Sequence, residues 1–396
     1  MFENVQSAPP DPILGLSEAF NKDPRAHKIN LSVGVYKDAA GATPILPTVR
    51  EAERRLLESQ KSKSYKPIEG DPAYGKLVRE LLFGKGSDLI DGGLAATCHT
   101  PGGTGALRLA ADFLAKQNKA GKVWISDPTW ANHPQVFEAA GLTCVKYGYF
   151  DAKTNGLDFA AMISSLEKAT RGDVVLLHAC CHNPTGVDPT LEQWKEVAEL
   201  CQKNGLIPLV DFAYQGFGAG LDEDAEGLRA LTSVVPEVLV CSSFSKNFGL
   251  YNERTGALTV KGTDKGQIAA VLSQLKSAAR TNYSNPPAHG GAIITTILSD
   301  ADLRAKWEAE VAMMRDRING MRHLFVDTLK QKGARGDFAF IAGQKGMFSF
   351  SGLNKAQVER LKDEFAIYIV GSGRISVAGM TEANMGPLTD AIVSVL

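Results

Sequence analysis

The sequence lacks several features that define specialised classes of protein. Its 43 Lys and Arg residues nearly balance its 44 Asp and Glu residues, and a net charge of −1 offers no footprint for nucleic acid or an anionic membrane surface. No apolar run approaches the roughly 18 to 20 residues that a membrane-spanning helix needs. The N-terminal segment has neither a basic stretch nor an uninterrupted apolar one, so we expect no secretory signal.

Motifs built on cysteine are also lacking. The six cysteines include no CxxC pair, so neither a disulfide framework nor a paired zinc site is indicated. Cys180 and Cys181 lie between His178 and His182 and form the one group that resembles a metal site. Because neighbouring side chains on an extended strand point to opposite faces, we expect no metal there. A reduced, cytoplasmic protein is the expectation.

The composition that remains is that of an ordinary globular protein. The chain has 396 residues, of which 44% are hydrophobic and 22% charged. At roughly 100 to 200 residues per domain, this length predicts two or three domains. With no charge excess on either side, the expected partner is a small molecule.

Between about residues 100 and 260, short apolar runs alternate with helical patterns. Runs this short and apolar are typical of strands buried on both faces, which predicts a mostly parallel α/β sheet. The runs are 123–126, 174–177, 206–210, 238–241 and 256–260.

Two helices are well marked in the sequence. Thr190 and Gln193 form a capping box for a helix over 191–204, and Gly205 supplies its end. From Leu303 to Leu329, apolar residues recur every three or four positions and predict one long amphipathic helix. A helix of that length spans roughly 40 Å and can run from one domain into another, so we place a domain boundary inside it.

Polar residues follow two of the predicted strands, where ligands bind in open α/β sheets. Asp211 comes directly after 206–210, and Lys246 lies in a Ser-rich turn after 238–241. Taken alone, Asp211 fits a loop cap or an ion pair, and Lys246 fits a surface lysine. Together they indicate pyridoxal phosphate, whose aldehyde forms a Schiff base with a lysine and whose ring nitrogen is commonly held by an aspartate.

That cofactor also needs a phosphate site. Gly102, Gly103 and Gly105 precede a helical run over 107–116, and glycines at a helix N-terminus let backbone N–H groups approach an anion. Such a cluster in isolation is equally compatible with a tight turn. It matches neither the Walker sequence nor the dinucleotide fingerprint.

These residues resemble the fold-type I pyridoxal phosphate enzymes, specifically the aspartate and aromatic amino acid aminotransferases, and within them the bacterial aspartate branch. The resemblance covers nearly the whole chain. Its motifs are 11–14, 30–36, 100–105, 181–186, 211–217, 245–254, 282–287, 346–350 and 372–374.

The resemblance implies an α/β fold with two parts. A large domain over 45–313 would hold a mostly parallel seven-stranded sheet flanked by helices and would bind the cofactor. Residues 1–44 and 314–396 would form an N-terminal arm and a smaller, discontinuous α/β domain. The protein would be a homodimer with shared active sites.

The resemblance also implies roles for individual residues. Lys246 would carry the cofactor and move the substrate proton, and Asp211 would hold the pyridine N–H. Tyr214 and Asn183 would bond the phenolic oxygen, and Trp130 would cover the ring. The phosphate would be held by Gly103, Thr104, Ser243, Ser245 and Arg254, joined by Tyr65 from the neighbouring subunit.

Two arginines would recognise the substrate, since a guanidinium binds a carboxylate through two parallel hydrogen bonds. Arg374 would bind the α-carboxylate. Arg280 would reach into the other subunit's site and bind the side-chain carboxylate of aspartate or glutamate. Gly34 would bring backbone close to the substrate, with Trp130 and Asn183 also beside it.

The implied reaction is reversible transamination between L-aspartate with 2-oxoglutarate and oxaloacetate with L-glutamate, by a ping-pong mechanism. Ser64 and the stretch 216–220 depart from the aspartate-preferring branch, whereas five other positions match it, namely Val35, Lys37, Thr43, Thr104 and Asn285. Activity on aromatic amino acids therefore stays open, and an aromatic aminotransferase is the nearest alternative. A β-lyase or decarboxylase is a second alternative. A cofactor-sensing regulator would need a basic DNA-binding extension that this sequence lacks.

Overall fold

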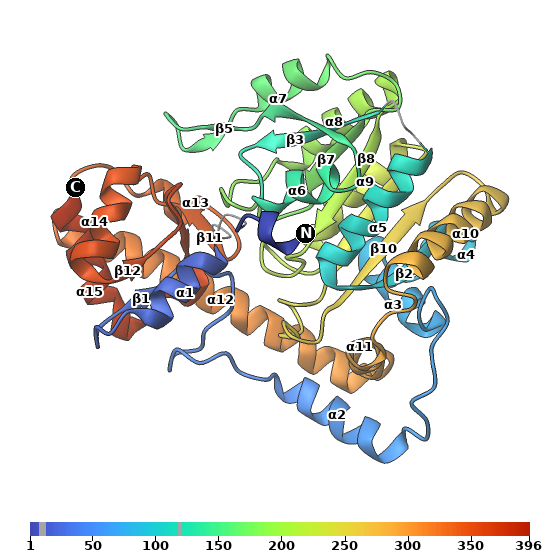
Figure 1. Ribbon diagram of the computed structural model, residues 1–396, viewed down its shortest axis with the longest axis horizontal. Helices are drawn as coiled ribbons and strands as arrows, with labels where there is room; N and C mark the ends of the chain where they lie inside the picture. The colour runs from blue at the N-terminus through green and yellow to red at the C-terminus, as the bar shows by residue number, and fades with distance from the viewer. Residues whose placement is uncertain (8–12, 118–120) are drawn as a thin grey trace. The chain divides into compact units, whose positions relative to one another are not determined.

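The computed structural model describes residues 1–7, 13–117 and 121–396 (Figure 1). Asp11 and Pro12, which begin the 11–14 motif, lie outside the described residues. The chain divides into two compact units, one of Met1–Thr43 with Ile318–Leu396 and one of Pro44–Arg317. The sequence places the boundaries at 44/45 and 313/314, and the role of each unit stays a prediction.

The larger unit is built on a seven-stranded sheet in the order β2-β10-β9-β8-β7-β3-β4. Strand β10 runs antiparallel to both of its neighbours, and the pairs from β9 to β4 are parallel. The predicted fold class is confirmed. The strands are β2 (Ala95–Pro101), β3 (Lys122–Asp127), β4 (Thr143–Gly148), β7 (Val174–His178), β8 (Ile207–Phe212), β9 (Val238–Ser243) and β10 (Thr255–Lys261).

Helices cover this sheet, and the best marked of them is α8 (Leu191–Asn204). Its capping box between Thr190 and Gln193 is present, and Gly205 ends it with φ of 64°. This helix begins and ends as the sequence predicts. The other helices of the unit are α2 (Pro47–Ser59), α3 (Pro72–Phe83), α4 (Asp88–Asp91), α5 (Gly102–Gln117), α6 (Asn132–Glu138), α7 (Phe159–Leu166), α9 (Glu226–Val234), α10 (Lys265–Asn282) and α11 (Ala288–Ser299). A short hairpin, β5 (Phe150–Asp151) with β6 (Gly156–Leu157), and the turn η2 (Glu223–Ala225) complete it.

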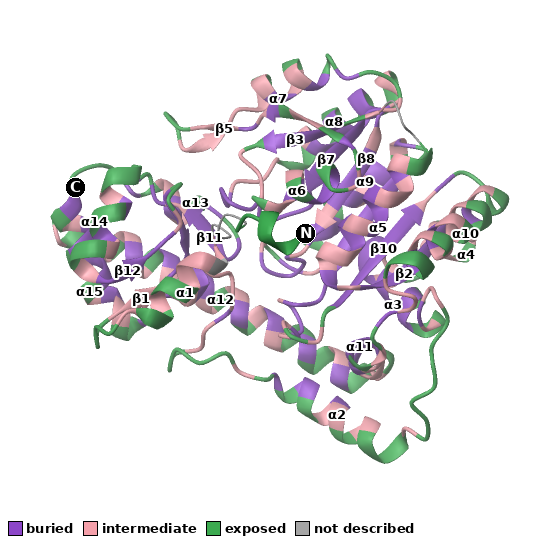
Figure 2. Ribbon diagram, in the orientation of Figure 1, coloured by how far each residue is buried: buried purple, intermediate pink, exposed green. Residues whose placement is uncertain are grey.

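One hydrophobic core cluster of the larger unit lies between the sheet and helix α5. Figure 2 shows the central strands as buried, and every residue of β7 and of β9 is buried. Pairing across the sheet sets His178 opposite Asp211, and Asp211 opposite Cys241. The register thus brings the carboxyl ends of β7, β8 and β9 together, where the sequence has its polar residues.

The smaller unit contains two short sheets. Strand β1 (Ile29–Asn30) pairs in parallel with β12 (Ile367–Tyr368), and β11 (Phe348–Phe350) pairs antiparallel with β13 (Arg374–Ser376). Helix α12 (Ala301–Gln331) contains the second boundary between the units. The remaining elements are η1 (Phe2–Asn4), α1 (Leu14–Lys22), α13 (Phe340–Gly343), α14 (Lys355–Phe365), η3 (Val377–Gly379) and α15 (Glu382–Val395). Within the described ranges, no helix is long and apolar enough to cross a membrane.

Candidate active site

Lys246 lies three residues beyond β9, in the turn that the sequence singles out. Its Nζ lies 4.8 Å from the centroid of the Tyr214 ring. Burial disfavours the ammonium form and lowers the pKa of Lys246 to about 8, with Asp211 opposing the shift and Arg254 adding to it. About a tenth of this amine is therefore neutral and nucleophilic at pH 7, far more than for an ordinary lysine.

Asp211 lies within β8 and has a side chain that is only 11% exposed. Its Oδ2 lies 3.0 Å from Nε2 of His133, a residue that the sequence analysis misses. Burial alone would raise the pKa of Asp211, but the hydrogen bond from His133 and the electrostatic influence of His133, His178 and Lys246 outweigh it and hold the pKa below its usual value. Asp211 is therefore an ionised carboxylate inside the protein.

His133 belongs to a chain of hydrogen bonds whose direction can be assigned. An ionised carboxylate only accepts, so Nε2 of His133 donates to Asp211 and its Nδ1 accepts from Thr129 Oγ1, 2.7 Å away. The hydroxyl then accepts from Nε2 of His178 at 3.2 Å, and Nδ1 of His178 accepts from the Asn183 backbone N–H at 3.4 Å. Every donor in this chain points toward Asp211.

The two remaining histidines of this region stay neutral. Burial lowers the pKa of His178 to about 3 and that of His182 well below its usual value. Their rings lie 4.1 Å apart, and Nε2 of His182 lies 2.9 Å from Ser126 Oγ. Both imidazoles therefore belong to the hydrogen-bonded framework behind Asp211.

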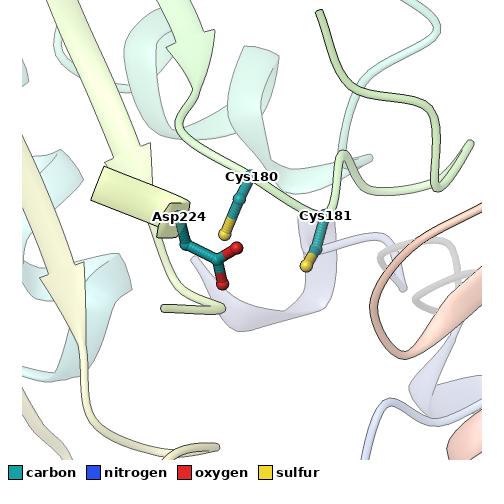
Figure 3. Close-up of side chains that lie close together, drawn as sticks. All are labelled: Cys180, Cys181 and Asp224. Carbon is teal, nitrogen blue, oxygen red and sulfur yellow. The ribbon is translucent and has the colours of Figure 1, made fainter. Parts of the chain in front are cut away.

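Cys180 and Cys181 do not point to opposite faces, and the expectation from an extended strand is wrong. Cys181 has a φ of 52°, and both Sγ atoms lie within 4.8 Å of a carboxylate oxygen of Asp224. Figure 3 shows the two sulfurs turned toward this carboxylate. Asp224 also accepts three backbone N–H groups between Gly216 and Ala219. These bonds already satisfy its charge and tie the loop after β8 in place, so we assign this group a structural role.

A cradle for an anion lies where β2 meets α5. Gly102 begins the helix with φ of 72°, and a Cβ added there would lie 2.5 Å from Nη2 of Arg254. A Cβ on Gly103 would lie 2.9 Å from Cβ of Ser243. Side chains at these two positions would displace their neighbours, so glycine leaves the helix N-terminus open to close approach.

The side chains around this cradle suit a phosphate. Nη1 of Arg254 donates to Ser245 Oγ at 3.4 Å, and the Ser243 and Ser245 side chains are both buried. Thr104 lies in the first turn of α5 and is partly buried. A guanidinium, two hydroxyls and a helix N-terminus form a donor set without a carboxylate, which fits a dianionic group.

The residues expected around the cofactor ring lie in the same unit. Asn183 and Tyr214 are 6% and 7% exposed, and Trp130 is partly exposed, with its ring 5.2 Å from that of His133. A nucleophilic amine, an ionised carboxylate and an anion cradle thus occur together in the larger unit. These three features fit pyridoxal phosphate.

Two residues that the resemblance assigns to the active site are exposed to solvent in this chain. Tyr65 lies in the segment between α2 and α3 and is 93% exposed. Arg280 lies near the end of α10 and is exposed, and its Nη1 donates to Ser284 Oγ. Both were expected to serve a neighbouring subunit.

Arg374 and Gly34 lie in the smaller unit. Arg374 is 4% exposed, donates from Nη2 to the Ser32 carbonyl at 2.6 Å and has its guanidinium carbon 4.1 Å from the Phe348 ring centroid. A Cβ on Gly34 would lie 2.3 Å from Cζ of Phe348. Gly34 is therefore a glycine because the Phe348 ring occupies the adjacent space.

An α/β sheet that carries a lysine of lowered pKa beside an ionised aspartate, with an anion cradle at a neighbouring strand end, is typical of the pyridoxal phosphate enzymes of fold type I. Comparison with known proteins narrows this class. The model of the family "Aminotransferase class I and II" matches residues 26–392, and the chain belongs to this family.

Several relatives match along nearly their whole length. The chain is 58% identical to an aspartate aminotransferase of Escherichia coli (strain K12), covering 100% of both chains. It is 48% identical to an aromatic-amino-acid aminotransferase of Pseudomonas aeruginosa, covering 100% of this chain and 98% of the relative. A solved aromatic-amino-acid aminotransferase from Burkholderia pseudomallei, covalently bound to pyridoxal phosphate, has a TM-score of 0.97 and 49% identity over 100% of this chain and 99% of its own. The predicted family and cofactor are confirmed.

Proposed function

We propose that this protein catalyses the reversible transfer of an amino group between L-aspartate and 2-oxoglutarate, giving oxaloacetate and L-glutamate. The observation that carries this proposal is the Lys246 amine, whose pKa of about 8 makes it nucleophilic near the ionised Asp211. The 58% identity to an aspartate aminotransferase supports aspartate as the amino donor. Two half-reactions share one site, so the first oxoacid leaves before the second binds.

Bound pyridoxal phosphate supplies an aldehyde that attaches amines covalently and a ring that withdraws electrons from the substrate Cα. Lys246 is the residue we assign to the attachment. With the cofactor bound, the neutral amine of Lys246 would take the proton from the substrate Cα and hold it for transfer. Asp211, kept ionised by His133, would hold the proton on the ring nitrogen.

The remaining assignments follow the family resemblance. Tyr214 and Asn183 hydrogen-bond the phenolic oxygen, and Trp130 covers the ring face and also borders the substrate. The phosphate is held by Gly103, Thr104, Ser243, Ser245 and Arg254, joined by Tyr65 of a second copy.

Substrate recognition in this proposal depends on two arginines. Arg374 binds the α-carboxylate beside the backbone of Gly34, and Arg280 of a second copy binds the side-chain carboxylate. The exposure of Tyr65 and Arg280 supports a homodimer in which each copy completes the other's site. The cytoplasmic location expected from the sequence stays a prediction.

A spectroscopic experiment tests the cofactor assignment. The purified protein should show a near-visible absorbance band from the attached cofactor, and Lys246→Ala should abolish both the band and aspartate turnover. Lys261→Ala is the matched control, because Lys261 is also partly buried with a lowered pKa but lies at the end of β10. A band that survives in Lys246→Ala would refute the assignment.

Aromatic amino acid transamination is the second candidate, since aromatic aminotransferases are also close relatives. We expect kcat/KM for aspartate to exceed that for phenylalanine. Arg280→Ser should lower the aspartate value by about a hundredfold or more while changing the phenylalanine value little, because only the dicarboxylate leaves a buried charge unpaired. A higher kcat/KM for phenylalanine would favour the second candidate, and equal losses on both would refute the role of Arg280.

A further inference from the structure

Arg322 of helix α12 is among the most deeply buried side chains of the smaller unit, with 1% exposure. Placing a guanidinium inside a protein is costly unless several acceptors meet it, whereas an aliphatic side chain would fill the same space without that cost. A buried arginine therefore calls for an account of what its hydrogen bonds fix.

The hydrogen bonds of Arg322 converge on one segment. Nη2 donates to the Gly346 carbonyl at 2.5 Å, and Nη1 donates to the Ile341 carbonyl at 3.4 Å and to Ser349 Oγ. Ile341 belongs to α13, Gly346 lies just before β11, and Ser349 is the middle residue of β11. A single side chain thus ties helix α12 to both ends of this segment.

The two faces of β11 contact different arginines. Ser349 faces Arg322, and side chains alternate along a strand, so Phe348 faces the other way. On that face the Phe348 ring lies 4.1 Å from the Arg374 guanidinium and fills the space beside Gly34. Strand β11 thus separates the two arginines, with Arg322 on one face and Arg374 on the other.

Strand β11 is short and is held from more than one side. It pairs with β13 over three residues, and this pairing is flanked by the bonds from the Val377 N–H to the Met347 carbonyl and from the Ser351 N–H to the Gly373 carbonyl. A shift of β11 would move the Phe348 ring and with it the surface on which the Arg374 guanidinium rests. The bonds from Arg322 act on the face opposite Phe348 and oppose that shift.

We propose that Arg322 is a positioning residue for the α-carboxylate site: it anchors β11 from behind, so that Phe348 holds the Arg374 guanidinium in the orientation that binds a carboxylate through two hydrogen bonds. This inference rests on the proposed function, in which Arg374 binds that group. Every amino acid and oxoacid substrate carries an α-carboxylate. Loss of Arg322 therefore weakens the binding of all these substrates alike, whereas loss of Arg280 weakens the binding of dicarboxylates only.

The test measures the half-reaction of the holoenzyme with L-aspartate, monitored through the absorbance of the cofactor. Arg322→Met should raise the half-saturating aspartate concentration about tenfold and lower the saturating rate less than about threefold, because binding geometry is lost and the chemistry is not. Arg322→Lys, which retains the charge but not the planar fork, should fall between. Ser349→Ala removes one acceptor and should shift the concentration in the same direction by a smaller factor, which keeps the test valid if Arg322→Met fails to fold.

A control and a double variant separate positioning from general loosening. Phe325→Leu alters another fully buried residue of α12 one turn further on and should leave the half-saturating concentration unchanged. In an Arg374→Ala background, Arg322→Met should add less than a twofold further increase, since both act through the same guanidinium.

The outcomes that would overturn the inference are distinct. An unchanged half-saturating concentration in Arg322→Met, an equal increase in Phe325→Leu, or losses that multiply in the double variant would each refute it. If Arg374→Ala alone leaves the aspartate concentration unchanged, the assignment of Arg374 under the proposed function fails instead.

Discussion

The chemistry of the larger unit depends on two ionisable side chains inside the protein, one of which favours its neutral form and the other its charged form. Burial pushes Lys246 toward its neutral form, whereas the hydrogen bond from His133 keeps Asp211 ionised against the same burial. A neutral amine and an anionic carboxylate are the states that attachment of the cofactor and protonation of its ring require. Both assignments can be tested residue by residue.

Replacing His133 with leucine should raise the pKa of Asp211, because the donor that stabilises its carboxylate is lost. Activity on the acidic side should then decline at a higher pH than in the unmodified protein. A hydrogen bond to a charged group contributes about 1.5 to 3 kcal/mol, so kcat should fall roughly tenfold to a hundredfold. The measurement is the dependence of kcat on pH.

His289→Leu serves as the control for that experiment. His289 is 46% exposed and lies near Glu53, away from the hydrogen-bond chain. Its replacement should leave the pH profile in place. A profile that is unmoved in His133→Leu would contradict the role given to His133.

The amine of Lys246 gives a second pH prediction, for uptake of pyridoxal phosphate by protein stripped of cofactor. Only the neutral amine attacks the aldehyde, and with a pKa of about 8 the neutral fraction rises tenfold per pH unit below that value. The rate at which the near-visible band returns should therefore increase up to about pH 8 and then level off. A rate still climbing toward pH 10 would mean that burial does not lower this pKa.

Some features of single residues cannot be predicted from the sequence. The sequence indicates that Asp211 needs a partner but does not identify it. His133 lies 78 positions away, and no local pattern marks it as that partner. Likewise, Cys181 leaves the extended conformation, which no periodicity rule anticipates. Contacts between distant segments are determined by packing, so no short stretch of sequence predicts them.

Secondary structure was predicted best where one local signal dominates. The five predicted strands are all members of the sheet, and α8 and α12 follow their capping and periodicity patterns. The apolar runs of the sequence do not predict strands β2 and β4. Strand β2 is rich in Ala and Thr, and β4 is an edge strand with mixed burial, so neither has a long apolar run.

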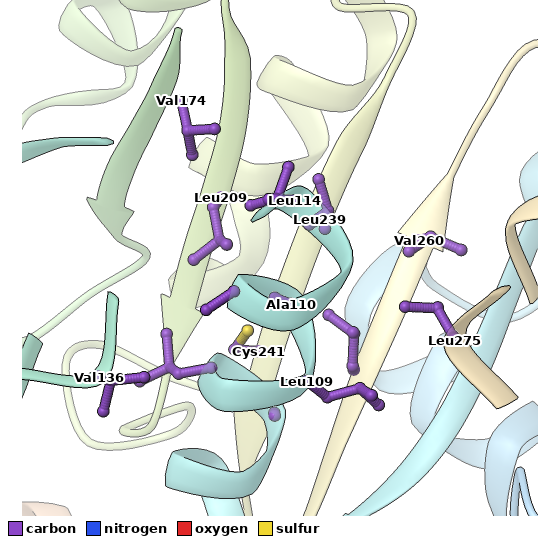
Figure 4. Close-up of a cluster of buried hydrophobic side chains, with 14 of the residues drawn as sticks. Leu109, Ala110, Leu114, Val136, Val174, Leu209, Leu239, Cys241, Val260 and Leu275 are labelled. Carbon is purple, nitrogen blue, oxygen red and sulfur yellow. The ribbon is translucent and has the colours of Figure 1, made fainter. Parts of the chain in front are cut away.

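Helix α5 shows how packing supplies what local patterns omit. Leu109, Ala110 and Leu114 on α5 pack with side chains of neighbouring strands, among them Leu239 and Val260 (Figure 4). The helix begins at Gly102, several residues earlier than the apolar run suggested. This packing fixes the position of the helix N-terminus, and therefore the anion cradle.

Helix α2 offers a test at the scale of elements. Its N-cap residue is Leu46, which makes no side-chain capping bond, and the Thr48 N–H donates instead to Oε1 of Glu310 at 3.1 Å. Because Glu310 also lies at the positive end of the helix dipole, Glu310→Gln should lower the free energy of unfolding by about 1 to 2 kcal/mol. Thermal and denaturant unfolding measure it.

Glu308→Gln is the matched control on the same helix. Glu308 is 44% exposed and pairs with Arg304 within the helix, an interaction that contributes about 0.5 kcal/mol or less. Equal stability losses in the two variants would show that Glu310 does not cap α2.

At the scale of the whole molecule, the residues that the family resemblance assigns to the site are distributed over both units of the chain. The cofactor residues lie in Pro44–Arg317, whereas Arg374 and Gly34 lie in the unit formed by the two ends of the chain. Motif order in the sequence predicted this set of residues through the family resemblance. No local pattern around Arg280 or Arg374 distinguishes either from a surface arginine.

Mixing two inactive variants tests the shared site directly. In a dimer of Lys246→Ala with Arg280→Ser, one site carries both defects and the other carries neither. Joint refolding of the two variants should therefore recover about a quarter of the unmodified activity, since about half of the dimers are mixed and each has one intact site. No recovery from a mixture shown to contain mixed dimers would contradict the assignment of Arg280 to the partner's site.

The central claim is amino transfer, and a single half-reaction tests it most directly. Holoenzyme is mixed with excess L-aspartate in the absence of any oxoacid, and the oxaloacetate, ammonia and CO₂ released are quantified per active site. We expect one equivalent of oxaloacetate, after which the reaction stops until 2-oxoglutarate is added, with no ammonia and no enzyme-dependent CO₂. Continuous release of ammonia or CO₂, or no oxaloacetate at all, would contradict the proposed function.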